Sequence, residues 1–128
     1  MRITIPALRT AASLALALAA GAGAGAALAH HGWAWTTGGD VELSGVVREA
    51  RLGNPHGVLR VDADGERWRV EVGQPWRNAR AGLTDALMAP GAEITAIGEP
   101  SADLSERRLK AERLRIGGET YELYPERD

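Results

Sequence analysis

Residues 57–72 read GVLRVDADGERWRVEV, and this stretch decides the fold. Apolar and polar side chains alternate on both sides of an Asp64-Gly65 pair. That pattern is typical of two antiparallel strands joined by a tight turn, because Asp-Gly readily adopts the backbone angles that a short hairpin needs. The sequence therefore predicts a hairpin with strands over residues 57–62 and 67–72.

The alternation also assigns the two faces of this hairpin. Successive side chains of a strand point to opposite faces, so every second residue shares a face. The residues expected in the core are Leu59, Trp68 and Val70. Those expected to face solvent are Arg67, Arg69 and Glu71.

The flanking sequence supplies the other elements of a small domain. Upstream, a strand is expected over residues 41–52, with a bulge or sharp bend at Gly45, where the apolar parity changes. Downstream, the apolar period lengthens into a short helix over residues 76–88, which ends before Pro90-Gly91. Further strands are predicted at residues 93–98, 108–116 and near Tyr121.

Three strands, a helix and then two or three strands is the element order of an OB-fold. The sequence therefore predicts an all-β domain with one short helix, in the form of a small OB-like Greek-key barrel of five to six strands. A generic six-stranded barrel or an SH3-like barrel fits the strands nearly as well, but the helix position favours the OB-like arrangement. The basic run Arg107–Lys110 is expected on a solvated edge strand.

The N-terminal stretch has the layout of an export signal. Residues 1–29 begin with basic side chains, continue as an Ala/Leu/Gly run without Asp or Glu, and end in Ala27-Leu28-Ala29. We expect residues 1–29 to be a signal peptide, 30–40 a lead-in and 41–128 the barrel domain, in a periplasmic or secreted protein without a stable membrane span after processing. A membrane anchor over residues 11–29 is the alternative.

Composition excludes several functions. The chain has no Cys, which removes disulfides, thiolate metal sites and cysteine nucleophiles. Residues 30–128 carry 13 Arg or Lys against 17 Asp or Glu. This acidic balance argues against general nucleic-acid binding, which needs a basic surface.

Five short motifs resemble those of a family of small exported bacterial proteins classed as a domain of unknown function. They are Ala29-His30-His31, Gly45-Val46-Val47, Asn54-Pro55-His56, Gly73-Gln74-Pro75 and Leu87-Met88-Ala89-Pro90-Gly91. The chain departs from the family pattern at Gly32, where Ser is more common, and at Leu52-Gly53, where an aromatic and a small polar residue are common. The resemblance implies an exported protein with this fold and implies no activity.

The three histidines are candidate metal ligands. Cleavage after Ala29 would give His30 a free α-amine, which can chelate a metal together with its own Nδ1. A further imidazole, from His31 or His56, would complete a three-nitrogen site that suits copper, the divalent metal that nitrogen ligands bind most tightly. In a second geometry the amine, the His31 amide and the His31 imidazole bind Cu(II) without any fold.

Other interpretations stay open at this stage. His30 and His31 could be an ordinary solvated terminus, and His56 could simply hydrogen-bond within its turn. The protein would then be a metal-free OB-like interaction module that binds an envelope protein or a glycan. No enzymatic activity is expected, because no nucleophile motif is present, and a copper oxygenase is the remaining enzymatic alternative.

Overall fold

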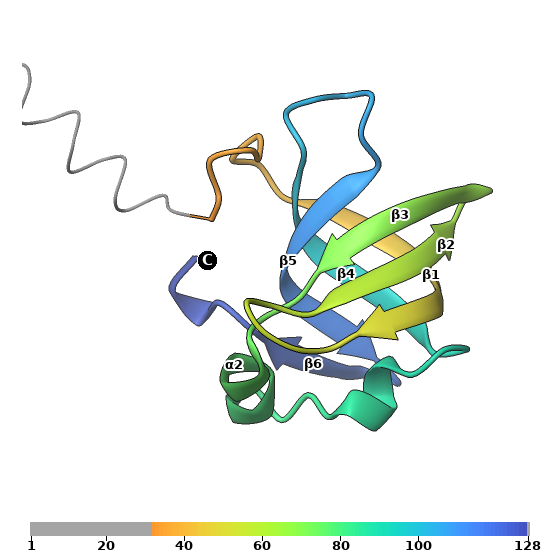
Figure 1. Ribbon diagram of the computed structural model, residues 1–128, viewed down its shortest axis with the longest axis vertical. Coiled ribbons are helices and arrows are strands. Elements are labelled where there is room, and N and C mark those ends of the chain that lie inside the picture. The colour runs from red at the N-terminus through yellow and green to blue at the C-terminus, as the bar shows by residue number, and fades with distance from the viewer. Residues whose placement is uncertain (1–31, 128) are drawn as a thin grey trace, which may run out of the picture. The chain divides into compact units, whose positions relative to one another are not determined.

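A computed structural model describes residues 32–127. The chain divides into two units, residues 1–34 and 35–128, and the fold below is that of the second. Within its described part, one sheet has the strand order β3-β2-β1-β4-β5-β6, and a parallel pairing of β3 with β5 closes it into a five-stranded barrel with β6 outside (Figure 1). The strands are β1 (Val41–Arg51), β2 (Val58–Ala63), β3 (Glu66–Glu71), β4 (Glu93–Pro100), β5 (Arg108–Ile116) and β6 (Glu119–Glu122).

The predicted barrel and its central hairpin are confirmed. β2 and β3 pair antiparallel with Leu59 opposite Val70, and both side chains are fully buried. Asp64 and Gly65 make the turn with positive φ angles of 50° and 76°, as a two-residue hairpin requires. Trp68 lies near the tip of this hairpin and is half-buried, so it covers the end of the core rather than its centre.

The predicted solvent-facing side of β3 is only partly correct. Arg67 is exposed, as expected, and Arg69 is half-buried. Glu71 is 1% exposed, so its predicted exposure is wrong. Its carboxylate is covered because His56 and Arg108 both contact it from other parts of the chain.

β1 bends where it changes partners. Its first half pairs with β4 up to Val46, and its second half pairs with β2 from Val46 onwards. At Gly45 the neighbouring strand comes so close that an added Cβ would collide with the carbonyl oxygen of Asp62. Gly45 therefore marks a close approach of two strands, and the bulge lies two residues later, between Val47 and Glu49.

The predicted helix over residues 76–88 is wrong in its length. The chain instead forms α2 (Pro75–Arg80) and a separate 3-10 turn η1 (Asp85–Met88). Gly82, with φ 80°, ends the first, and the Thr84 hydroxyl accepts a hydrogen bond from the Leu87 N–H at the start of the second. Both segments lie at one end of the barrel (Figure 1).

The basic run Arg107–Lys110 does not lie on an edge strand, and that prediction is wrong. β5 pairs with β4, with β6 and, through its first residues, with β3. The C-terminal segment extends the pairing with β6, and the Leu123 and Tyr124 N–H groups donate to the Glu112 carbonyl at 2.8 and 3.0 Å. Lys110 is consequently buried, with 6% of its surface exposed.

A bulge between β4 and β5 places one acidic side chain. Ile97 pairs with Arg113 and Gly98 pairs with Ala111, so Glu112 is the extra residue of β5. The two backbones approach closely here, and a Cβ on Gly98 would collide with the Lys110 carbonyl oxygen. The bulge thus presents Glu112 to the outer face, where it is buried under the C-terminal segment.

The predictions for the N-terminal region fall mostly on residues outside the described ones. These are the signal peptide over residues 1–29 and the ligands His30 and His31. Among the described residues, no helix has the length and apolar character that crossing a membrane requires.

Candidate functional site

Charged side chains are buried in a row across the outer face of the barrel. Glu71 of β3 pairs with Lys110 of β5, and Lys110 pairs in turn with Glu99 of β4. All three are at most 6% exposed. Because a buried charge is costly unless it is paired and hydrogen-bonded, the partners of each carboxylate decide what this face can do.

Glu71 is surrounded by positive or donating groups. Its Oε1 lies 2.7 Å from Nε2 of His56, and its Oε2 lies 2.5 Å from Nε of Arg108. The Nε of Arg69 is 3.5 Å from the same Oε2. The Arg108 guanidinium stacks on the ring of Trp35, 3.7 Å from its centroid, which holds the arginine against the barrel.

The His56 side chain lies against the buried carboxylate of Glu71. It follows the Asn54-Pro55 turn between β1 and β2, and 25% of its side chain is exposed. Burial lowers the pKa of His56, and Glu71 only partly opposes this. The lowered pKa favours the uncharged ring at neutral pH, and its Nε2 lies 2.7 Å from Oε1 of Glu71.

This orientation leaves the second ring nitrogen available. Among the described residues, Nδ1 of His56 has no hydrogen-bond partner. Metal-binding histidines commonly donate the hydrogen of one ring nitrogen to a carboxylate, which fixes the tautomer and frees the other nitrogen for the metal. Of the predicted ligands His30, His31 and His56, the structure describes His56 alone, and its Nε2 lies 2.7 Å from a carboxylate oxygen.

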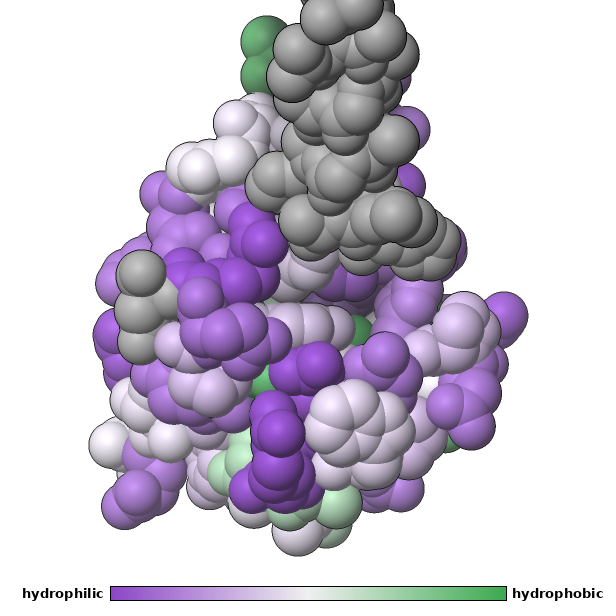
Figure 2. Space-filling view, turned by 90° about the vertical axis from the view of Figure 1, so that its left-hand side faces the viewer, coloured by the Kyte–Doolittle hydropathy of each residue, from purple (hydrophilic) through white to green (hydrophobic). Residues whose placement is uncertain are grey.

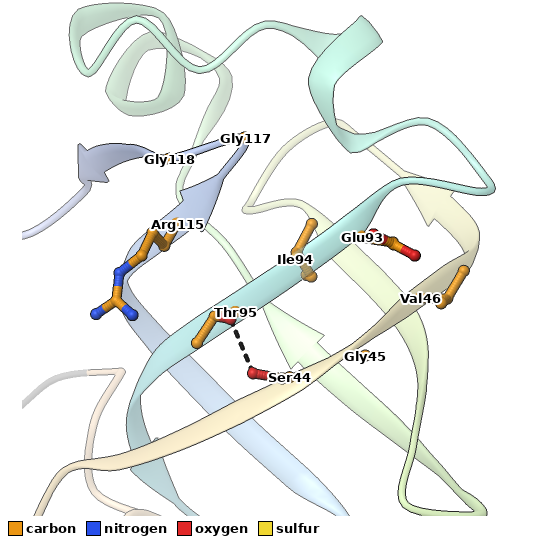
Figure 3. A pocket seen from close by; sticks show the side chains of 9 residues that line it. All are labelled: Ser44, Gly45, Val46, Glu93, Ile94, Thr95, Arg115, Gly117 and Gly118. Carbon is orange, nitrogen blue, oxygen red and sulfur yellow. Dashed lines mark hydrogen bonds between the residues drawn. The ribbon is translucent and has the colours of Figure 1, made fainter.

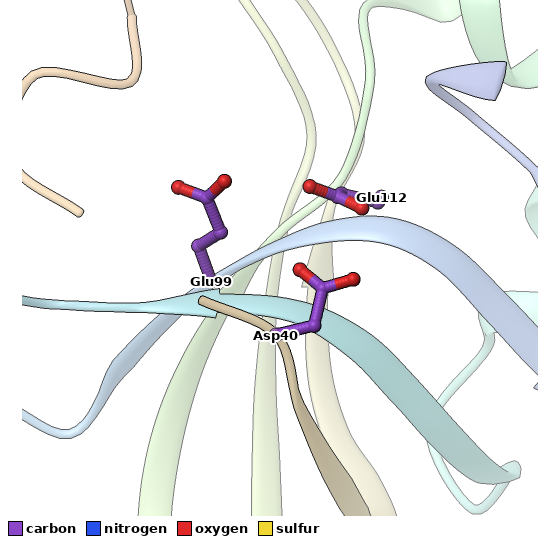
Figure 4. A group of neighbouring side chains, drawn as sticks. All are labelled: Asp40, Glu99 and Glu112. Carbon is purple, nitrogen blue, oxygen red and sulfur yellow. The ribbon is translucent and has the colours of Figure 1, made fainter. Parts of the chain in front are cut away.

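A second group of acids lies at the other end of the buried row. Asp40 precedes β1, Glu99 lies on β4 and Glu112 lies at the β5 bulge. One carboxylate oxygen from each lies within 4.8 Å of the others, and the three side chains turn toward a common space (Figure 4).

Arginine and threonine satisfy part of this acidic cluster. Arg127 places its Nη2 2.5 Å from Oε1 of Glu99 and its Nε 3.2 Å from Oε1 of Glu112. Thr36 donates a short hydrogen bond to Oε2 of Glu99. Nη1 of Arg113 lies 4.0 Å from Oδ2 of Asp40.

The two glutamates respond differently to these surroundings. Burial acts to raise the pKa of Glu99, but the hydrogen bonds from Thr36 and Arg127 outweigh it, and the pKa is lowered. Burial, a side-chain hydrogen bond with Asp40 when one of the two acids is protonated, and the charge of Asp40 raise the pKa of Glu112 to about 6. Its Oε2 is buried and has no hydrogen-bond partner.

Sequence reasoning missed this acidic cluster. Asp40, Glu99 and Glu112 are far apart in the chain and follow no metal-binding spacing. They meet only through the β1–β4–β5 pairing and the bulge, which no local sequence pattern predicts.

The side of the domain that carries the C-terminal segment and α2 is predominantly hydrophilic (Figure 2).

An open hollow lies elsewhere on the barrel. It has a volume of about 460 Å³ and is bounded by β1, β4 and the turn before β6. Ser44 and Thr95 share a hydrogen bond of 2.8 Å across it, and Glu93 and Arg115 stand at its sides (Figure 3). It holds no buried titratable side chain, so it offers a contact surface rather than a chemical site.

Comparison with known families gives one match. The family of unknown function DUF6152 matches residues 17–110. The chain belongs to this family. The matched range of this DUF6152 member includes His30, His31, His56, Glu71 and Glu99 and ends before Glu112 and Arg127. No curated protein matches the chain.

The solved structures that match this DUF6152 domain are similar to it only at low sequence identity and with low TM-scores. A ZRD-deleted mutant of TiaS in complex with agmatine has a TM-score of 0.49 and 16% identity, over 66% of this chain and 26% of TiaS. The Stn1-Ten1 complex of S. pombe has a TM-score of 0.49 and 20% identity, over 60% of this chain and 57% of that one. The chain therefore spans between a quarter and three fifths of these proteins.

Proposed function

We propose that this protein is a small periplasmic metal-binding protein that holds copper through a processed N-terminal His30, in metal storage, delivery or sensing. The α-amine and the imidazole of His30 would chelate the metal, and His56 or His31 would supply the remaining imidazole. The observation that carries the proposal is the His56–Glu71 pair, in which Nε2 lies 2.7 Å from a buried carboxylate oxygen. That contact presents Nδ1 as a ligand nitrogen.

The path of the lead-in supports a role for the N-terminus at this position. The N–H of Thr37 donates to the Pro100 carbonyl at 3.0 Å, and Trp35 stacks with Arg108, which binds Glu71. The chain from Trp35 back to His31 covers four residues, a reach of at most about 14 Å. Under the proposal, these residues would let the processed N-terminus approach the turn that carries His56.

Export processing is tested first, because the chelate depends on it. We expect N-terminal sequencing of the exported protein to begin at His30. An N-terminus at Met1, Ala26 or Ala27 would contradict the chelate, since the α-amine would then lie too far from the His30 imidazole.

Copper binding is tested by competition titration of Cu(II) against a chelator. Affinity should fall sharply when one Ala precedes His30, because the α-amine leaves chelating range while every side chain stays in place. His56→Ala should lower affinity roughly tenfold or more if the turn supplies a ligand. Glu49→Ala, at an exposed position of β1, is the matched control. Equal affinity in all four proteins would reject the proposal.

The alternative function is a metal-free interaction module for an envelope protein or a glycan. The observation that favours it is Trp76, which is 54% exposed on α2, with the guanidinium groups of Arg77 and Arg80 4.7 and 5.2 Å from its ring centroid. Exposed tryptophan beside arginine is a composition that binding surfaces favour. Trp76→Ala should abolish partner binding under this alternative and should leave copper affinity unchanged.

A further inference from the structure

We propose that Asp40, Glu99 and Glu112 form a binding site for a hard divalent cation such as Ca²⁺ or Mn²⁺. This site is separate from the proposed copper site and does not depend on it. One oxygen from each carboxylate lies within 4.8 Å of the other two, which is the separation that ligands around one such ion can have. The three side chains come from three segments and face a common space (Figure 4).

The strongest observation is an oxygen atom without a partner. Glu112 is 1% exposed, and its Oε2 has no hydrogen-bond donor. A buried polar atom that loses its contact with water and gains no other contact is costly. Its other oxygen, Oε1, already accepts a hydrogen bond from the Arg127 Nε at 3.2 Å. Oε2 is therefore the oxygen that can take a further contact.

The charges around the cluster leave room for a cation. Arg127 lies at hydrogen-bond distance from Glu99 and Glu112, and the Arg113 guanidinium lies 4.0 Å from Asp40. Three carboxylates therefore face two arginines. The donor set consists of oxygens, with no histidine in the group. Carboxylate oxygens select hard cations of the calcium, magnesium and manganese type rather than copper.

The test uses the exported protein after treatment with EDTA. Isothermal titration with Ca²⁺ and with Mn²⁺ at pH 7.5 should show one site, and saturating ion should raise the melting temperature by several degrees. Glu112→Gln should lose both effects. Glu119→Gln, an exposed glutamate of β6, is the matched control and should behave like the wild type.

Two further variants separate folding and copper from the result. Asp40→Asn alters an exposed position, so it should fold normally while its Ca²⁺ affinity falls at least as clearly as that of Glu112→Gln. His56→Ala should bind Ca²⁺ and Mn²⁺ like the wild type, even if its copper affinity is lost. Wild-type protein that binds neither ion at millimolar concentration, or that binds them as tightly as both acid variants do, would overturn the proposal and leave a proton shared between Asp40 and Glu112.

Discussion

The two ends of the buried row on the outer face differ in how their acids are balanced. At one end, Glu71 alone receives contacts from His56, Arg69 and Arg108. At the other, Glu99 and Glu112 share Arg127, and Asp40 has Arg113 at 4.0 Å. The first group thus has three positive or donating side chains around one carboxylate, whereas the second has two arginines for three carboxylates. The number of positive partners around a buried carboxylate therefore indicates whether it can take a further ligand.

Lys110 lies between these groups and shows why they are not isolated from each other. It pairs with Glu71 on one side and Glu99 on the other. Burial lowers the pKa of Lys110, and the attraction of Glu71 only partly opposes this. Through these strand pairings Lys110 connects the two ends of the row.

The largest expected effect is at the balanced end. Glu71→Gln removes the charge that compensates Arg108 in a buried position, so the free energy of unfolding should fall by about 3–5 kcal/mol. Urea denaturation at pH 7.5 measures the loss. Glu112→Gln should cost less than about 1 kcal/mol in the same assay, because the amide replaces an acid that was short of partners. Equal losses would remove the contrast between the two ends.

The next largest effect is expected for Arg127, the arginine that contacts Glu99 and Glu112. Arg127→Gln should lower the stability of the metal-free protein by about 1–3 kcal/mol, since it leaves oxygens of Glu99 and Glu112 unsatisfied. The same variant should bind Ca²⁺ more tightly, because a competing positive charge is gone. Urea denaturation and calcium titration of one preparation give both numbers. Weaker calcium binding would mean that Arg127 organises the site rather than competing for it.

A smaller effect should appear in the pH dependence of stability. The pKa of Glu112 is raised from an ordinary 4.5 to about 6, so between these values the folded state keeps a proton that the unfolded state has lost. Its contribution to stability is complete below pH 4.5 and is lost as the pH rises through 6. The loss should be on the order of 1–2 kcal/mol in EDTA.

The titration of His56 changes stability with pH in the opposite direction, so its effect has to be separated from that of Glu112. The pKa of His56 is lowered from 6.5, so its contribution to stability is lost as the pH falls below 6.5. The difference between wild type and Glu112→Gln cancels the histidine effect. That difference should shift in favour of the variant from pH 4.5 to 6.5, and a constant difference would contradict the raised pKa of Glu112.

The smallest effect is expected for an exposed pair that resembles the buried ones in distance alone. Arg48 Nε lies 2.9 Å from Asp62, and both side chains are more than a third exposed. Water and salt screen such pairs. Arg48→Gln should leave the urea midpoint within experimental error, and a clear loss would show that burial does not decide the outcome at the other sites.

The fold could be predicted from local pattern, because alternation about Asp64-Gly65 constrains a hairpin by itself. The helix prediction is wrong because Gly82, with φ 80°, divides the segment, and this glycine is present in the local sequence. Glu71 has the parity of an outward residue, and that parity is correct. Its burial depends on His56 and Arg108, which are distant in the chain.

The acidic cluster lay beyond sequence reasoning for a different reason. Its members meet through a strand register that shifts at Gly98, and a register is a property of two strands together. The copper site stays a prediction, since His30 and His31 lie outside the described residues. His56 was identified from its residue type, while its partner Glu71 was assigned to solvent.

The parallel pairing that closes the barrel has a consequence for folding. It joins Arg69 to Arg108, Val70 to Leu109 and Glu71 to Lys110. Contacts between such distant segments carry a large entropic cost of loop closure, so we expect this seam to form after the hairpins. The ionic contacts of Glu71 would then assemble only in the final step, and the seam would be the first place to open. Amide hydrogens there, such as that of Arg69, which donates to Arg107 at 2.8 Å, would exchange with solvent sooner than those of the β2–β3 hairpin.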